Sequence, residues 1–189
     1  MCMIRIDTDR LMIRPLRIED LSAFHFYRSN PEVTKYQGFD VFTLKQAEAF
    51  INSQTDKEFA NPGEWVQYGI ENKETGVLIG DCAIRLGLTD NRLGEIGITI
   101  SPKEQKKGYA KETLHAILDF LFGIDGFHRV TEIVDTENVA SIQLLESLGF
   151  RREGHFVDNI FFKGAWGSEY QYAMLKSEWL HKKLSNRNS

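Results

Sequence analysis

Apolar and polar residues alternate in four segments of the first hundred residues. Three of these segments are RLMIRPL at 10–16, WVQYGIE at 65–71 and VLIGDCAIRL at 77–86, and the polar turn NKETG joins the second to the third as a hairpin. The fourth, EIGITI at 95–100, places its three isoleucines on one face and Glu95, Gly97 and Thr99 on the other. A period of two predicts strands, because successive side chains of a strand point to opposite faces of the sheet.

Helical spacing replaces this alternation in four other segments. Residues 18–30 predict a first helix that Asn30-Pro31 ends, and a second helix is expected from Thr43, where Gln46 completes a capping box. A long apolar stripe from 108 to 122 predicts a third helix. The fourth is TENVASIQLLESLGF at 136–150, in which Asn138 is placed to cap and Gly149 suits the residue after the helix.

Three further strands are expected in the second half of the chain. They are HRVTEIV at 128–134 and the segments near 155–162 and 168–175, of which the last two pair through a turn at Lys163-Gly164. The whole order is a strand, two helices, three strands, a helix, a strand, a helix and two strands. It predicts a mixed α/β (α+β) domain around one sheet. Only the strands on either side of the helix at 108–122 should be parallel, because that helix is a crossover connection.

Composition supports one soluble domain spanning residues 1–189, with a core at about 8–175. Hydrophobic residues make up 42% of the 189 and charged residues 26%, which excludes disorder, and no linker or repeat divides the chain. The formal net charge of -4 argues against a nucleic-acid-binding protein and suits an amine substrate. No apolar run approaches the ~20 residues that span a bilayer, and the N-terminus lacks a secretory signal. We therefore expect a cytoplasmic protein that binds no membrane.

The cysteines and histidines do not form a metal-binding pattern. Cys2 and Cys82 belong to no CxxC pair, and the five histidines show neither HxxxH nor HxH spacing. We expect no metal site and no disulfide framework.

The segment QKKGYA at 105–110 lies between a predicted strand and the start of the long helix. It lacks the second glycine and the GK[ST] ending of a nucleotide P-loop, which excludes that class of site. Two interpretations stay open. The segment could be a solvated turn, or it could hold a pyrophosphate, since Gly108 lets an oxygen approach the backbone and the first amides of a helix point outward. Lysine is poorly placed for the helix dipole at a helix start, which favours the anion site.

A second motif accompanies this loop. The pattern QxxGxA after a strand ending in I-x-P, followed by a long helix, a strand and N-x-x-S-x-x-L-x-x-x-x-G-F, resembles the GNAT superfamily of acetyl-coenzyme A-dependent N-acetyltransferases. RLMIRPLRIEDL and GEIGITISPKEQKKGYAKETL resemble the branch that includes ribosomal-protein N-terminal acetyltransferases. The resemblance covers about residues 8–175. It implies one GNAT-like domain with a mixed, mostly antiparallel sheet, a splayed strand pair and helices on both faces.

The resemblance also implies how acetyl-coenzyme A is held. The strand at 95–100 would carry a bulge and diverge from the strand at 128–134, so that backbone groups of Ile98, Thr99 and Ile100 could meet the pantetheine arm and the thioester. Asn138 would contact the pantetheine, cap its helix, or do both. The pyrophosphate would be held by the segment Gln105, Lys106, Lys107, Gly108, Tyr109 and Ala110. The mechanism requires no metal.

Proton transfer defines the catalytic candidates. Ser141 matches a serine of the resembled branch that protonates the leaving thiolate, and the stretch GFRREGHF lacks the tyrosine that many GNAT enzymes use there. Glu95 is our first candidate for the base that deprotonates the amine, with a solvated strand-end carboxylate as the alternative. A glutamate that the branch carries near the C-terminus is replaced here by Ile160.

The aromatic stretch NIFFKGAWGSEYQYAML suggests one wall of an acceptor pocket, with a plain hairpin core as the alternative interpretation. Trp166 is the expected contact, and Asp158 or Glu169 could anchor an ammonium group. Residues 39–42 are expected to form the other wall.

We therefore expect an acyltransferase that moves an acetyl group from acetyl-coenzyme A to a primary amine by direct attack in a ternary complex. The amine could be a protein N-terminus or a small molecule. Two alternatives stay open: a catalytically silent coenzyme A-binding sensor or interaction module of the same fold, and an enzyme that transfers a longer acyl group. Either a monomer or a homodimer is compatible with the resemblance.

Overall fold

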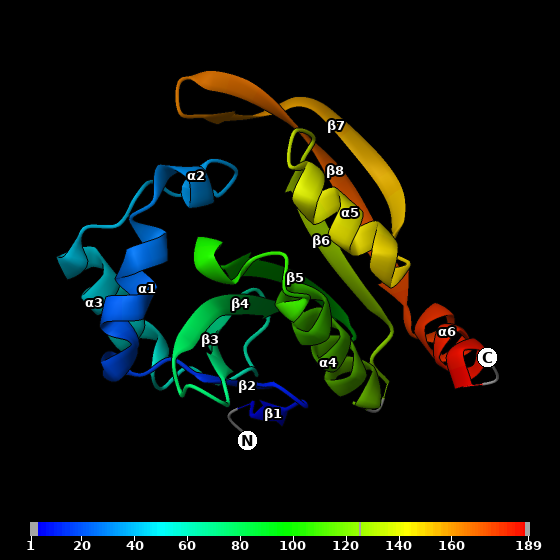
Figure 1. Ribbon diagram of the computed structural model, residues 1–189. Helices are drawn as coiled ribbons and strands as arrows, with labels where there is room; N and C mark the ends of the chain where they lie inside the picture. The colour runs from blue at the N-terminus through cyan, green and yellow to red at the C-terminus, as the bar shows by residue number, and fades with distance from the viewer. Residues whose placement is uncertain (1–3, 125, 188–189) are drawn as a thin grey trace.

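The computed structural model describes residues 4–124 and 126–187. Its centre is one eight-stranded sheet in the order β1-β2-β3-β4-β5-β6-β8-β7 (Figure 1). The strands are β1 (Ile6–Asp7), β2 (Leu11–Pro15), β3 (Trp65–Asn72), β4 (Leu78–Leu86), β5 (Leu93–Ile100), β6 (Arg129–Asp135), β7 (Arg151–Phe162) and β8 (Ala165–Leu175). The helices are α1 (Leu21–Arg28), α2 (Pro31–Thr34), α3 (Leu44–Gln54), α4 (Tyr109–Gly123), α5 (Val139–Leu148) and α6 (Lys176–Arg187).

The β5–β6 pair is the parallel one among these named strands, as the crossover argument predicts. Its register covers only three positions, from Leu93 opposite Arg129 to Glu95 opposite Thr131. Beyond that point β6 continues to pair with β8 as far as Asp135, while β5 continues along β4. The two central strands therefore separate, and Figure 1 shows them diverging between α4 and α5.

The bulge that the resemblance implies in β5 is not present in this chain. Pairing of β4 with β5 runs without a shift from Gly80 opposite Ile100 to Leu86 opposite Gly94. Register shifts occur instead between β3 and β4 at Ile70 and in the β7–β8 hairpin. The separation of β5 from β6 thus follows from the different partners of the two strands, because each stays straight along its own antiparallel neighbour.

Two hydrophobic clusters cover the two faces of the sheet, which confirms helices on both sides. The smaller cluster holds α1 and α3 through Phe24, Tyr27 and Ile51. The larger one is built around α4, α5 and the inner strands, and includes Leu114 and Leu145. In Figure 1, α1 and α3 lie on one side of the β3–β5 strands, and α4 lies on the other.

Most predicted helix boundaries are confirmed by their caps. Thr43 and Gln46 form the capping box of α3. Asn138 caps α5, its Oδ1 accepting from the Ser141 amide at 3.2 Å. Gly149 ends α5 at a φ of 89°, a left-handed conformation that glycine adopts without strain.

Two helical features differ from the expectation. The first helix ends at Arg28, and Asn30-Pro31 begins α2 rather than closing α1: the Asn30 side chain accepts from the Glu32 amide at 3.0 Å, and proline suits the first helical position. The C-terminal helix α6 was not expected from its polar sequence. It is held by Trp179, which is buried and donates from Nε1 to Asp119 of α4 at 2.8 Å.

Within residues 4–124 and 126–187, no helix is long and apolar enough to cross a membrane. Cys82 is buried in β4, and this burial raises the pKa of its thiol. Cys2 lies outside the described residues.

A buried ionic cluster joins α1 to β4. Asp81 is fully buried and accepts from Tyr27 at 2.6 Å, from Arg28 Nε at 3.1 Å, from the Arg28 terminal nitrogen and from Gln67. The Arg28 guanidinium also lies 4.6 Å from the centre of the Phe39 ring. A buried charge is tolerated only when it is paired and hydrogen-bonded, so this cluster fixes the position of α1 over the sheet.

We expect Arg28→Ala to lower the free energy of unfolding by about 3–5 kcal/mol, because it leaves the Asp81 carboxylate buried without its cation. Urea denaturation measures the change. Arg92→Ala is the control, since Arg92 pairs with Asp90 at the surface, and its unfolding midpoint should stay near that of the parent. Equal midpoints for the two variants would show that the buried pair does not hold α1.

Candidate functional site

A cavity of about 890 Å³ opens where β5 and β6 separate. Its sides come from both strands, the segment between α2 and α3, the start of α5 and the tip of the β7–β8 hairpin. A second cavity of about 610 Å³ lies beside α1, where Arg14 and Asp20 form a buried ion pair. We take the first cavity as the candidate site. The separated strands leave backbone N–H and C=O groups there that no neighbouring strand binds, and such groups can bind a ligand.

Two glutamates lie at the point of separation. Glu95 lines the cavity from β5, and its carboxylate pairs with Arg85 of β4, whose guanidinium lies 4.7 Å from the centre of the Trp65 ring. Glu132 lines it from β6, is only 5% exposed and has a buried Oε2 without a hydrogen-bond partner. Burial, together with the negative charge of Glu95, raises the pKa of Glu132 to about 8.

Glu132 is the cavity residue that the sequence analysis did not identify as a candidate. The segment HRVTEIV was interpreted only as a strand, although Glu132 occupies the buried phase of its alternation between Val130 and Val134. A charged residue in the apolar phase of a strand is the pattern that could have identified it, since buried carboxyl groups are rare without a partner.

Asn138 and Ser141 reach the cavity from the first turn of α5. The Asn138 side chain caps the helix and so holds the Ser141 backbone in place. Ile98 and Thr99 line the same cavity from β5, whereas Ile100 does not and is buried in the main cluster. Glu95, Ser141 and part of the β5 strand therefore line one cavity, and their catalytic and binding roles stay predictions.

The segment 105–110 lies just past the end of β5, outside the residues that line the cavity. Gly108 precedes α4 with a φ of 84°, and Lys106 is also left-handed with a φ of 62°. Left-handed residues at both positions point the neighbouring backbone N–H groups outward, which is the arrangement found in backbone anion-binding sites. The loop depends on glycine here because a side chain would be strained at this φ, although a Cβ would make only an ordinary contact of 3.4 Å with Arg10.

Contacts of the loop refine the expected roles of its side chains. The side-chain Nε2 of Gln105 donates to the Ile100 carbonyl at 3.0 Å, and the Lys107 ammonium pairs with Glu104 at 2.9 Å. Arg10 donates to the Lys107 carbonyl at 3.1 Å. The side chains of Gln105, Lys107 and Arg10 therefore hold the loop in shape. The backbone N–H groups of the loop and the exposed Lys106 could bind an anion. The residues fit a pyrophosphate.

The expected acceptor residues separate into two groups. Trp166, Glu169 and the pair Phe39 and Phe42 line the cavity. Asp158 does not: it is exposed in the register shift of β7, with a φ of 46°, and its amide donates to Ser168 Oγ at 2.9 Å. Sequence spacing could not show this, because the shift moves Asp158 out of the strand pairing.

The tip of the β7–β8 hairpin contacts the end of α2 beside the cavity. Lys163 lies at the turn with a φ of 50°, and its ammonium donates to the Thr34 carbonyl at the end of α2 at 2.8 Å. Phe162 and Lys163 line the cavity, so this contact joins two of its walls. Within the part of the chain that the structure describes, no group of three or more histidines, cysteines or acidic residues could hold a metal ion.

Residues 10–151 match the model of the acetyltransferase (GNAT) domain family. This chain belongs to the GNAT acetyltransferase family. It is 34% identical to an uncharacterized N-acetyltransferase of Bacillus subtilis, YnaD, over 92% of this chain and 98% of the relative. The crystal structure of a GNAT-family acetyltransferase from Bacillus anthracis is 30% identical, with a TM-score of 0.83 over 93% of this chain and all of that one.

A third match bears on the substrates. The structure of a Vibrio cholerae spermidine N-acetyltransferase in complex with CoA and spermine is 25% identical, with a TM-score of 0.77, and the match covers 92% of this chain and 99% of that one. The recognition of the family from the QKKGYA and Asn138 motifs is thus confirmed, as is the expectation of an N-acetyltransferase enzyme.

Proposed function

We propose that this enzyme uses acetyl-coenzyme A to acetylate a primary amine of a small molecule that carries further positive charge. The observation that carries the proposal is the cavity at the β5–β6 separation, which is lined by acidic and aromatic residues. Similarity to the spermidine enzyme with bound CoA and spermine supports both substrates.

The charges around the cavity favour a cation. Five acidic residues line it, at Glu95, Glu132, Asp135, Glu137 and Glu169. Arg85 pairs with Glu95, and the raised pKa of Glu132 keeps it mostly protonated near pH 7, so Asp135, Glu137 and Glu169 remain as the acidic groups that favour a cation. The basic residues of the lining are Arg28, which Asp81 neutralises, and the two lysines Lys35 and Lys163, so the acidic excess is small.

The lining and the relatives favour a small acceptor over a protein N-terminus. The Lys163 ammonium donates to the Thr34 carbonyl, so the hairpin tip and the end of α2 meet beside the cavity and narrow the space for a polypeptide chain. The aromatic side chains of Phe39, Phe42 and Trp166 can contact the methylene groups between the charges of a flexible amine.

Acetyl-coenzyme A would approach from the α4 side. The backbone amides around Gly108 would hold its pyrophosphate at the positive end of α4, and β5 beyond Glu95 has no β6 partner, so its backbone is available to the pantetheine. The acetyl thioester would then reach the separation point near Ile98 and Ser141.

The chemistry requires two proton movements. An alkylamine with a pKa of ~10 arrives as an ammonium ion, so a carboxylate at the cavity floor must first take a proton. The amine nitrogen then attacks the thioester carbon; the C–N bond forms and the C–S bond breaks. Ser141 would donate its hydroxyl proton to the departing thiolate and regain one from the acetylated nitrogen.

A panel of amines tests the proposed function by thiol release and by product mass. We expect spermidine, spermine and other small amines with several charges to be acetylated, and peptides with free N-termini not to be. Acetylation of peptides alone would overturn the choice of acceptor. Binding of coenzyme A without thiol release from any amine would indicate a silent sensor.

Replacing Gly108 by valine should weaken coenzyme A binding by at least ~10-fold, or ~1.4 kcal/mol, because a β-branched residue is strained in this left-handed backbone and would obstruct the approach of the pyrophosphate to the loop amides. Calorimetric titration measures this affinity. Gly123→Val is the matched control at the other end of α4, where a Cβ meets no atom within 4 Å. If both variants bind coenzyme A like the parent, the loop is a solvated turn.

Ser141→Ala should lower kcat by ~10²-fold and leave coenzyme A affinity unchanged, if the hydroxyl protonates the thiolate. Steady-state rates and calorimetry on the same samples separate the two effects. Ser147→Ala, on the exposed side of the same helix, should retain full activity. Normal turnover by Ser141→Ala would show that another group supplies the proton.

A further inference from the structure

Glu132 has a position that packing alone does not explain. It is the first β6 residue beyond the last β5–β6 pair, Glu95 opposite Thr131, and so stands where the two strands begin to separate. Its Oε2 is buried without a partner, yet the residue lines the same cavity as Ile98 and Ser141. An unpaired carboxyl group in this place costs stability, and an apolar residue like its neighbour Val134 would avoid that cost.

The groups around Glu132 leave it without a cation. On β5, Glu95 pairs with Thr131 and so projects from the other face of the sheet, where Arg85 of β4 pairs with it, and it acts on Glu132 only through its charge. Its partner on β8 is Tyr172, whose hydroxyl donates to Glu146 of α5 at 2.9 Å. Across the described residues, no lysine, arginine or histidine makes an ion pair or hydrogen bond with Glu132. Its carboxyl group is therefore available to a ligand.

We propose that Glu132 is the catalytic base that takes the proton from the substrate ammonium group, in place of Glu95. The inference rests on the proposed function and assigns its proton acceptor. The Glu132 carboxylate accepts one N–H proton of the ammonium ion, and the neutral amine attacks the thioester. A second proton leaves the nitrogen and reaches the thiolate through Ser141. Glu132 then releases its proton to water, so one proton appears for each acetyl group transferred.

Glu95 has a different part in this arrangement. Its carboxylate is held by Arg85, and its negative charge acts on Glu132. Burial is the larger cause of the raised pKa of Glu132, and the charge of Glu95 adds to it. The pH dependence follows: Glu132 is protonated and inactive below its raised pKa of about 8 and becomes an effective base above it. Activity should rise as the pH increases through that value.

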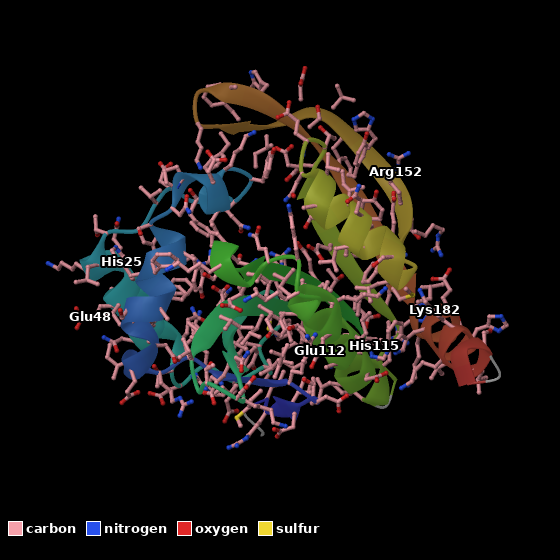
Figure 2. All side chains as sticks on the ribbon, viewed as in Figure 1. His25, Glu48, Glu112, His115, Arg152 and Lys182 are labelled. Atoms are coloured by element: carbon pink, nitrogen blue, oxygen red, sulfur yellow. The ribbon has the colours of Figure 1, made fainter. Side chains whose placement is uncertain are left out.

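Glutamate-to-glutamine variants at three positions test the assignment, with kcat/KM for spermidine measured from about pH 6 to about pH 10. E132Q should lose ~10²-fold in kcat and lose the inflection near pH 8, with coenzyme A affinity unchanged. E95Q should keep most of its activity but move the inflection to lower pH, because a charge that raises the pKa of Glu132 is gone. E48Q is the control, since Glu48 is an exposed residue of α3, far from β6 (Figure 2).

The opposite pattern would overturn the proposal. If E95Q is inactive and E132Q shows only a shifted inflection, Glu95 is the base. If E132Q turns over like the parent with the same inflection, Glu132 has only a structural role. E132D, which retains a carboxylate on a shorter side chain, should recover part of the activity that E132Q loses.

A measurement without substrate separates this proposal from the proposed function. Infrared difference spectra of the parent minus E132Q should show a protonated carboxyl group at about pH 6 that disappears by about pH 10. A carboxylate already ionised at about pH 6 would overturn the role of Glu132, whatever the acceptor. Acetylation of no amine, with this titration present, would overturn the proposed function and leave the base without a reaction.

Discussion

The site depends on the early end of pairing between β5 and β6. Three paired positions hold the two halves of the sheet together, and beyond them each strand follows its own antiparallel neighbour. This divergence leaves β5 backbone groups without partners, opens the cavity and brings the start of α5 to its edge. Every residue of the proposed chemistry is positioned relative to that one point, so changes in strand pairing there would alter cofactor and acceptor binding together.

The same point concentrates negative charge. Glu95 and Glu132 lie on adjacent strands, and only Glu95 has an arginine. Burial, with the charge of Glu95 as a second cause, raises the pKa of Glu132 to about 8, so its carboxyl group is mostly protonated near pH 7. In the proposed mechanism, an ammonium ion bound beside Glu132 would favour its ionisation, so that substrate binding and base ionisation would be coupled.

Much of the fold could be predicted from the sequence, because its local features are explicit. Thr43, Asn138 and Gly149 mark helix ends through backbone chemistry that needs no tertiary information. Glu132 and Asp158 could not be placed in the same way. Whether a strand residue is buried beside a separated partner, or lies in a register shift, depends on which strands pair and over what length.

The helix α6 could not be predicted from the sequence because it too depends on contacts between distant segments. Its sequence is largely polar, and it is stabilised by one buried tryptophan that contacts α4 through Asp119 and the ring of His115. Figure 2 shows His115 on the side of α4 that faces α6. Such a helix depends on tertiary packing rather than on its own periodicity.

The loop at 105–110, which we propose binds the pyrophosphate, also contacts the beginning of the chain. Arg10 donates to the Lys107 carbonyl and pairs with Glu112 on α4, and Glu112 also accepts from Thr8 Oγ1. Figure 2 shows Glu112 on α4, the helix that follows the loop. Residues almost one hundred positions apart thus form one unit. A chimera that exchanged the first strands with those of a relative would need to carry the matching start of α4, or the loop would lose its support.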